Sequence, residues 1–529
     1  MTSAAASATI GPFAPFRRRA FVLLWGAALI ANTGTWIRDV ANGWTMTELA
    51  SSSLMVALVQ SAVTLPVFLL SLPAGALGDI FDRRRMLLAI QVLLIAVSLS
   101  LAAATYFGVM TAPLLLALTF AGGVGFALQG PTWQAVVAEL VPRAELNAAV
   151  ALNSTGINVA RAIGPALGGL VLATSGALLA YLIDAASYLA VIAALLLWRR
   201  TPGVAHGAPE RFAPAIAAGV RYVLLSADVK RVLLRSAVFF LFASAYWALL
   251  PLVARQQLGG DASLYGALLG AVGAGAVTGA LLLPTLRRGR SGGTVVLAGT
   301  LLTAAAMAAL ALSSSGVVAF IALFIAGAAW IAVLTTLNVT MQTALPDWVR
   351  ARGLAIYLTV FFGAMTLGSA IWGQVATVLD VPASLLVAAV GAALIGVVAA
   401  AAVLPQGDAD LTPSMHWPAP IVIGTETRGP VLIEIAYEIA PTSRAAFLSA
   451  LNALGRARRR DGALDWGVYE DEGRPGHFTE IFFAATWRDH LRQHERITHA
   501  DAALQAAVDA FHIGPEPKRV RHLVGAQGN

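Results

Sequence analysis

The sequence predicts a polytopic, all-α membrane domain followed by a small soluble α+β domain. Hydrophobic residues make up 58% of the 529-residue chain, and its mean hydropathy is +0.76, whereas soluble domains are roughly 45–50% apolar. As far as residue 404, short polar segments divide the chain into apolar stretches of about 20 residues, the length that crosses a bilayer. After Pro405 the composition changes abruptly, and alternation with period two appears.

The apolar stretches are expected to be helices, because hydrocarbon offers no hydrogen-bond partner to backbone N–H and C=O groups. Twelve spans are predicted, over residues 20–46, 53–77, 86–107, 112–137, 147–172, 177–198, 232–255, 263–286, 294–313, 316–340, 353–378 and 382–404. We therefore expect the lipid bilayer to be the main partner of residues 1–405.

Arginines mark one side of the predicted bundle. With a cytoplasmic N-terminus, the inner segments carry arginine clusters such as Arg17–Arg19 and Arg83–Arg85, while the outer loops carry only Arg255. Positive loops stay on the cytoplasmic side. The expected location is thus the cell (inner) membrane, with the N-terminus and the C-terminal domain in the cytoplasm. Nucleic acid is not an expected partner, because the basic residues sit at membrane boundaries and not on one patch.

The twelve spans fall into two related halves. Residues 1–198 form the first half and residues 232–405 the second, and the segment 199–231 between them is predicted to contain an amphipathic helix on the inner membrane surface. A shift of 204 residues aligns Gly123 with Gly327, Pro142 with Pro346, Gly164 with Gly368 and Gly169 with Gly373. Repeated halves are typical of alternating-access transporters, which hold substrate between them.

Residues 428–529 are predicted to form a separate domain after a linker at 406–427. Strands are expected at 431–439, 463–471, 476–486 and 519–525, with helices after the first strand and from Trp487. The order β-α-β-β-α-β is that of a ferredoxin-like fold. This domain resembles the antibiotic-biosynthesis-monooxygenase-like group of dimeric α+β barrels, which implies dimerisation or a regulatory role. An oxygenase role is the alternative, although no nucleophile–base pair is evident.

The loop between the second and third spans, GALGDIFDRRRM, carries a dense charge cluster. Its pattern Gly75-x-x-x-Asp79-x-x-x-Arg83-Arg84 resembles the loop signature of the major facilitator superfamily, with Ile80 and Asp82 departing from the usual residues. The resemblance implies a twelve-helix major facilitator fold. It also implies that this loop is a cytoplasmic gate, in which Asp79 meets a helix N-terminus and Asp82 adds a second acid. The alternative is an ordinary positive loop, which leaves Asp79 unexplained.

The fifth span contains Gly164-Pro165-x-x-Gly168-Gly169. This pattern resembles the motif that marks antiporters of the same superfamily. Glycines on one helix face let a second helix approach closely, so tight packing without any bearing on the direction of transport is the alternative interpretation.

Ionisable residues inside the predicted spans are candidates for ion coupling, because a charge in the bilayer normally faces a cavity or a partner. Asp39 and Asp184 are the candidate proton carriers. Arg38 and Arg161 are candidates for ion pairing or substrate binding, and Arg161 could instead join helices by pairing permanently with an aspartate. The polar candidates for the cavity lining are Asn32, Gln60, Asn153, Asn158, Trp247 and Asn338.

Metal and cofactor chemistry is not predicted. The chain has no cysteine, and therefore no thiolate site. His490 and His494 share one helix face, with His499 nearby, but a zinc site needs a third ligand, and solvated histidines explain the pattern equally well. We expect no metal, no cofactor and no catalytic residue.

Over nearly its whole length, including FRRRAFVLLWGAALIANTGTWIRDVANGW, the chain resembles the enterobactin-exporter and macrolide-efflux group of drug–proton antiporters, especially transmembrane secretion effectors with a soluble tail. The resemblance implies proton-coupled export of a small organic molecule such as a drug, siderophore or secondary metabolite. A proton-coupled importer and a membrane-tethered protein with an active C-terminal domain are the alternatives.

Overall fold

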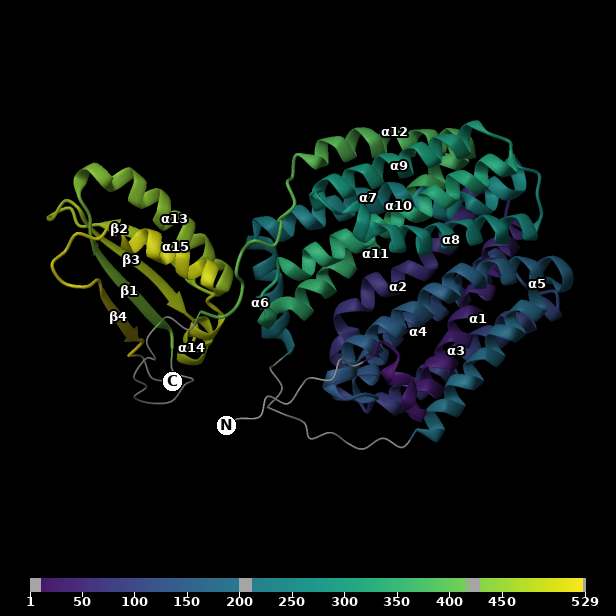
Figure 1. The fold of residues 1–529 in the computed structure, drawn as a ribbon, viewed down its shortest axis with the longest axis horizontal. Coiled ribbons are helices and arrows are strands. Elements are labelled where there is room, and N and C mark those ends of the chain that lie inside the picture. Colours follow the sequence, from purple (N-terminus) through teal and green to yellow (C-terminus); the bar gives the residue numbers. More distant parts are fainter. Residues whose placement is uncertain (1–10, 199–211, 415–416, 418–428, 527–529) are drawn as a thin grey trace. The chain divides into compact units, whose positions relative to one another are not determined.

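A computed structural model of the chain describes residues 11–198, 212–414, 417 and 429–526. In this part of the chain, eleven helices are long and apolar enough to cross a membrane (Figure 1). They are α1 (Arg19–Leu49), α2 (Ser53–Ile80), α3 (Arg83–Tyr106), α4 (Ala112–Glu139), α5 (Leu146–Leu197), α7 (Ala227–Leu252), α8 (Ala262–Leu286), α9 (Gly292–Leu312), α10 (Gly316–Thr343), α11 (Asp347–Val378) and α12 (Val381–Ala400).

Helix α5 contains two of the twelve predicted spans. As one straight helix its 52 residues would extend about 78 Å, more than twice the ~30 Å of the hydrocarbon core. Gly176 interrupts it with φ 76° and ψ 176°, a backbone conformation that glycine adopts without steric cost. The predicted boundary between the fifth and sixth spans is therefore confirmed, and all twelve spans are accounted for.

The two halves use equivalent glycines to bring equivalent helices together. Gly164 of α5 packs on α1, and Gly368 of α11 packs on α7. Gly169 of α5 packs on α8, and Gly373 of α11 packs on α2. In each half, one helix (α5 or α11) thus lies between a neighbour of its own half and a helix of the other half. The 204-residue repeat predicts this equivalence.

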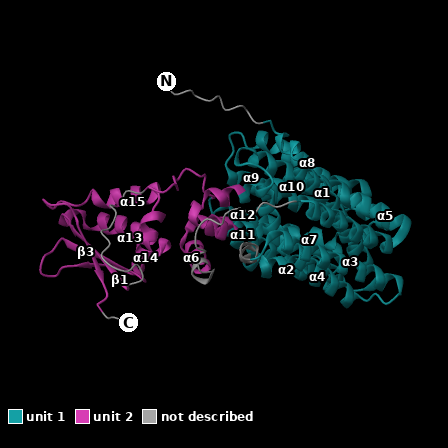
Figure 2. Ribbon diagram, turned by 90° about the horizontal axis from the view of Figure 1, so that it is seen from below, with its two compact units in different colours: residues 1–207, 233–338, 355–403 teal, residues 208–232, 339–354, 404–529 magenta. Residues whose placement is uncertain are grey.

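The chain divides into two compact units (Figure 2). The membrane unit comprises residues 1–207, 233–338 and 355–403, and the second unit comprises 208–232, 339–354 and 404–529. The predicted linker helix is α6 (Phe212–Leu225), which falls in the second unit. There the guanidinium of Arg460 lies 5.0 Å from the ring centroid of Tyr222 in α6, so α6 packs against the C-terminal domain.

The C-terminal domain is built on one antiparallel sheet. Its elements are β1 (Val431–Glu438), α13 (Arg444–Asp461), β2 (Leu464–Glu470), β3 (His477–Ala484), α14 (Trp487–Arg496), α15 (His499–Asp509) and β4 (Arg519–Val524). The strand order is β2-β3-β1-β4, which places the first strand in the interior of the sheet, beside the last. The predicted α+β domain is confirmed, with two helices where a single one was predicted between β3 and β4.

The core of this domain lies on the face that the period-two pattern predicts. Val431, Ile433 and Ile435 of β1 are buried, and they pack with Phe447 and Leu451 of α13. The alternate residues of β1 are more exposed. Burial of one strand face against the apolar face of a helix accounts for the stability of this arrangement.

Candidate functional site

A cavity lies in the membrane unit, and its volume is about 1000 Å³ when the space at its open end is included. Helices of both halves line it: α1, α2 and α5 from the first half, and α7, α8, α10 and α11 from the second. The polar residues on its wall include Asp39, Asn42, Gln60, Thr64 and Arg161. Two of the predicted charged residues, Asp39 and Arg161, therefore face the same cavity.

Arg38 connects the cavity wall to a fully buried acid. Its Nη2 lies 3.1 Å from Asp39 Oδ1, and its Nη1 lies 3.3 Å from Asp184 Oδ2. The Asp184 side chain is completely inaccessible, and that of Arg38 is 8% exposed. The two predicted proton carriers are thus joined through one guanidinium, with Asp39 at the cavity and Asp184 behind it.

Two hydroxyl groups complete this cluster. Ser98 Oγ donates to Asp184 Oδ2 over 2.6 Å, and Arg38 Nη1 donates to the Tyr188 hydroxyl over 3.2 Å. Asp184 Oδ1 has no hydrogen-bond partner among the described residues. The cluster therefore holds two acids against one base and leaves one carboxylate oxygen unsatisfied, an arrangement that can take up a proton.

Arg161 lies on the cavity wall, apart from the Arg38 cluster. Among the residues that the structure describes, no carboxylate forms an ion pair with it. The predicted alternative, a permanent Arg161–aspartate pair between helices, is not what the structure contains, because Arg38 occupies that role toward both Asp39 and Asp184. A guanidinium at a cavity surface can bind an anionic group.

The second half contributes an aromatic wall. Trp247, Trp330 and Phe361 all line the cavity, and the ring centroids are 5.6 Å apart for Trp247 and Trp330 and 6.1 Å apart for Trp330 and Phe361. Such a surface suits a flat apolar group of a ligand. The cavity therefore offers one charged wall and one aromatic wall.

The structure places some of the predicted polar residues on the cavity wall and others elsewhere. Gln60 and Trp247 lie on the cavity wall, whereas Asn32 and Asn158 are not among its lining residues. Asn153 instead accepts a hydrogen bond from Trp133 Nε1 at 3.0 Å, which joins α5 to α4. Amides in spans thus serve both as lining and as contacts between helices.

The glycines of the GPxxGG motif face two different helices. A Cβ at Gly164 would lie 2.6 Å from Trp36 Cβ in α1. A Cβ at Gly169 would lie 2.7 Å from the Cα of Gly266 in α8. Since α1 belongs to the first half and α8 to the second, the motif lets α5 pack closely within its own half and across to the other.

The arginines of the predicted gate loop join three helices of the first half. Arg83 Nη1 lies 2.7 Å from Glu139 Oε1 at the end of α4. Arg84 Nε donates to the carbonyl oxygen of Leu195 near the end of α5, over 2.8 Å. One ion pair and one hydrogen bond to a backbone carbonyl thus join the start of α3 to the ends of α4 and α5.

The acids of the gate loop are described in part. Gly75 and Asp79 belong to the last turns of α2, and their side chains lie outside the described part of the chain. Asp82 is the N-cap of α3, where its Oδ1 accepts the backbone N–H of Arg85 over 2.9 Å. Asp82 thus has a local capping role in α3, and the gating role of Asp79 stays a prediction.

Comparison with known proteins identifies the family. The chain matches the transmembrane secretion effector family over residues 10–529. It belongs to this family.

Two relatives show how similar the chain is to known proteins. It is 27% identical over 394 residues to the multidrug efflux pump Tap of Mycolicibacterium fortuitum, which covers 72% of this chain and 95% of Tap. It is 25% identical over 253 residues to the staphyloferrin A transporter of Staphylococcus aureus, covering 47% of this chain and 63% of that transporter. The chain thus spans less than two thirds of the second relative. One of these relatives is a multidrug efflux pump and the other is a transporter.

Solved structures show the fold of the membrane region. The chain superposes on an inward-facing, unoccupied bacterial homologue of the human lysosomal transporter Spinster with a TM-score of 0.58, at 15% identity, over 72% of this chain and 96% of that one. A D-xylose–proton symporter matches with a TM-score of 0.58 at 16% identity, over 74% and 98%. The predicted major facilitator fold is confirmed.

Several residues of the site were not predicted from the sequence. Ser98 and Tyr188 complete the charge cluster, and Trp330 and Phe361 form the aromatic wall. A serine or an aromatic residue in an apolar span carries no signal of its own, because packing explains it equally well. Only the folded arrangement of the helices places these side chains beside the charges and the cavity.

Proposed function

We propose that this protein exports a small organic molecule in exchange for protons, by alternating access of its cavity to the two membrane faces. The observation that carries this proposal is the position of Asp39 on the cavity wall, where it shares Arg38 with the buried Asp184. The family assignment and the similarity to a multidrug efflux pump support export as the direction.

The proposed coupling rests on the charge balance of the cluster. With both acids ionised, Asp39, Arg38 and Asp184 together carry one net negative charge, and binding of one proton makes the cluster neutral. A charge in a low-dielectric site interacts strongly with its surroundings, so this change favours one access state over the other. A substrate that binds the deprotonated state better drives the opposite change.

The walls of the cavity define the proposed class of substrate. Trp247, Trp330 and Phe361 favour a flat aromatic or apolar group, and Arg161 favours an anionic group on the same molecule. An amphiphilic organic anion fits both walls. The proposed orientation has the N-terminus and the C-terminal domain in the cytoplasm, and the arginine distribution supports it.

The experiment is transport in everted membrane vesicles that carry an imposed gradient with an acidic lumen. Fluorescein serves as the anionic aromatic probe and ethidium as a cationic one. An exporter that exchanges substrate for protons accumulates the probe in the lumen, and an ionophore that collapses the gradient stops accumulation. Asp39→Asn is expected to lose gradient-driven accumulation, because it keeps the size of the side chain and removes the ionisable acid.

The control variant is Asp380→Asn, which changes an acid that caps the start of α12 at the membrane boundary. It is expected to transport like the wild type. Accumulation by Asp39→Asn at the wild-type rate would contradict the proposed coupling. Probe accumulation only with a gradient of the opposite sign would indicate an importer.

A further inference from the structure

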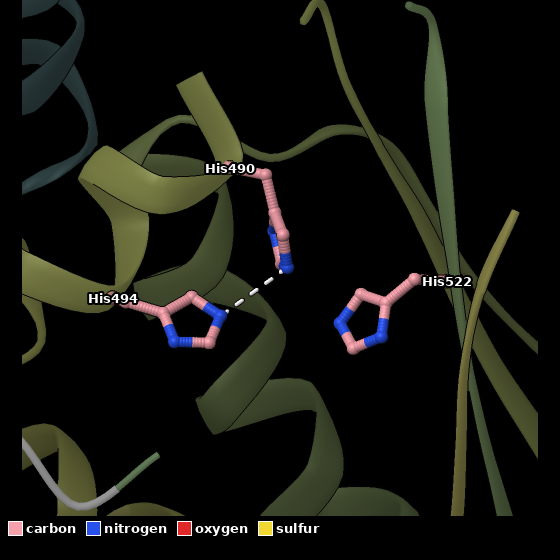
Figure 3. Close-up of side chains that lie close together, drawn as sticks. All are labelled: His490, His494 and His522. Carbon is pink, nitrogen blue, oxygen red and sulfur yellow. Dashed lines mark hydrogen bonds between the residues drawn. The ribbon is translucent and has the colours of Figure 1, made fainter. Parts of the chain in front are cut away.

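Three histidines lie close together in the C-terminal domain (Figure 3). His490 and His494 lie one turn apart on α14, and His522 lies on β4. Ligand atoms of the three rings all lie within 4.8 Å of one another. The sequence placed only the first two together, because the third is separated from them by α15 and the turn that precedes β4.

The register of the sheet explains why His522 reaches α14. His522 pairs with Ile433 of β1, and Ile433 is a core residue on the helix-covered face. Paired residues on adjacent strands point to the same face. His522 therefore points toward the helices, while its neighbours Arg521 and Leu523 point to the other face.

The spacing of the nitrogens fits a tetrahedral metal ion. Zinc binds imidazole nitrogen at about 2.0–2.1 Å in tetrahedral geometry, which places two ligand nitrogens about 3.3 Å apart. His490 Nε2 and His494 Nε2 are 3.2 Å apart. A shift of about 1 Å or more in the His522 side chain would bring its ring nitrogen to the same distance from the other two nitrogens. Such a shift is possible because β4 is an exposed edge strand.

A neighbouring amide sets the orientation of the most buried ring. His490 Nδ1 lies 3.3 Å from Gln493 Oε1, so a proton on Nδ1 leaves the Nε2 lone pair directed at the cluster. Such a partner on the outer nitrogen is characteristic of metal-binding histidines.

The positive charge of Arg458, which lies near His490, is already compensated. Arg458 belongs to the surroundings of His490, but its Nε lies 2.6 Å from Glu480 Oε1 in a fully buried ion pair. The Arg458–Glu480 pair therefore brings no net charge to the surroundings of the three histidines. Trp417 and Trp487 pack on the rings, with centroids 4.6 Å from His494 and 5.5 Å from His490, respectively, and limit access of water.

We propose that His490, His494 and His522 form a binding site for a divalent transition metal, with zinc as the best fit. Neutral imidazole is a borderline ligand that suits zinc and its neighbours in the first row. Three protein ligands leave one position open. The bound metal would join the edge strand β4 to α14 and so hold the final strand of the sheet in place.

The test uses the full-length protein in detergent, purified through a tag without histidine and stripped with a chelator. Zinc alone is the probe, and its affinity is measured by competition with a chromophoric zinc indicator. One zinc ion per chain is expected. His522→Asn, which changes the most exposed of the three rings, is expected to weaken binding by about 100-fold or more, and Gln493→Leu by about 10- to 100-fold.

The matched control is His499→Asn, because His499 is an exposed histidine of the same domain and is expected to leave zinc affinity unchanged. A second readout is amide hydrogen exchange over residues 519–524, which zinc is expected to slow in the wild type and not in His522→Asn. Equal zinc affinity of the wild type and His522→Asn would overturn the proposal, as would exchange in β4 that is indifferent to zinc.

Discussion

Arg38 of α1 and Asp184 of α5 form an ion pair whose nitrogen and oxygen lie 3.3 Å apart at a place that solvent does not reach. The two residues are separated by 146 positions in the chain. The same guanidinium also holds Asp39 on the wall of the cavity. An event at the cavity surface, such as binding of a proton or a substrate, therefore acts directly on a charge that is buried between α1 and α5.

Removing the shared base should destabilise the membrane domain. Arg38→Gln leaves two acids without their partner, and loss of one member of a buried ion pair costs about 3–5 kcal/mol. We expect a lower thermal unfolding midpoint in detergent at pH 8, and a smaller deficit at pH 5, because acid neutralises the unpaired carboxylates. Arg19→Gln, which changes an exposed residue of the same helix, should leave the midpoint unchanged. Equal midpoints for both variants would show that the pair is not important for stability.

The contact between Gly169 and Gly266 should limit movement of the two halves against each other. Gly169→Ala introduces a Cβ that overlaps the α8 backbone, so we expect at least about a tenfold loss of transport, since a cost of 1.4 kcal/mol corresponds to a factor of ten. Gly26→Ala in α1 meets no atom within 4 Å and serves as the matched control. Its expected effect is neutral or slightly stabilising, because alanine favours helix by about 1 kcal/mol. Equal transport by both variants would contradict a tight α5–α8 contact.

Arg161 should select anionic substrates. Hydrogen bonds to a charged group contribute about 1.5–3 kcal/mol, so Arg161→Gln should raise the KM for fluorescein by about 10- to 100-fold. The KM for ethidium should change little. Arg161→Lys keeps the charge and should retain part of the affinity for the anion. A parallel change for both probes would indicate a structural role for Arg161 instead.

The C-terminal domain has a buried ion pair of its own, between Arg458 and Glu480. Glu480 is fully buried, and it also accepts hydrogen bonds from Trp466 Nε1 and the Tyr437 hydroxyl. Arg458→Met should cost about 3–5 kcal/mol of domain stability, seen as faster amide exchange in β3 of the full-length protein. Arg444→Met removes an exposed pair and should change the stability of the domain little, because solvent screens such pairs. Similar rates of amide exchange in β3 of Arg458→Met and Arg444→Met would contradict the expected difference in stability.

Local patterns predicted the elements of the fold, and long-range packing decided the site. Span length and period-two alternation are properties of neighbouring residues, so the twelve spans, the break near Gly176 and the strand β1 followed from the sequence. The partner of each buried charge did not, because Arg38 and Arg161 are equally plausible from composition alone. Only helix packing places Arg38 beside Asp184, and only sheet register brings His522 to α14.

The central claim is that protonation of the Asp39–Arg38–Asp184 cluster changes which face of the membrane the cavity opens to. The chain has no cysteine, so Leu49→Cys and Val378→Cys at the ends of α1 and α11 allow specific spin labelling of one residue in each half. The measurement is the distance distribution between the two labels at pH 8 and pH 5 in the full-length protein. We predict that the distribution shifts with pH, and that it stays fixed when Asp39→Asn and Asp184→Asn are both added. A pH-dependent shift of the same size in that variant would contradict the account.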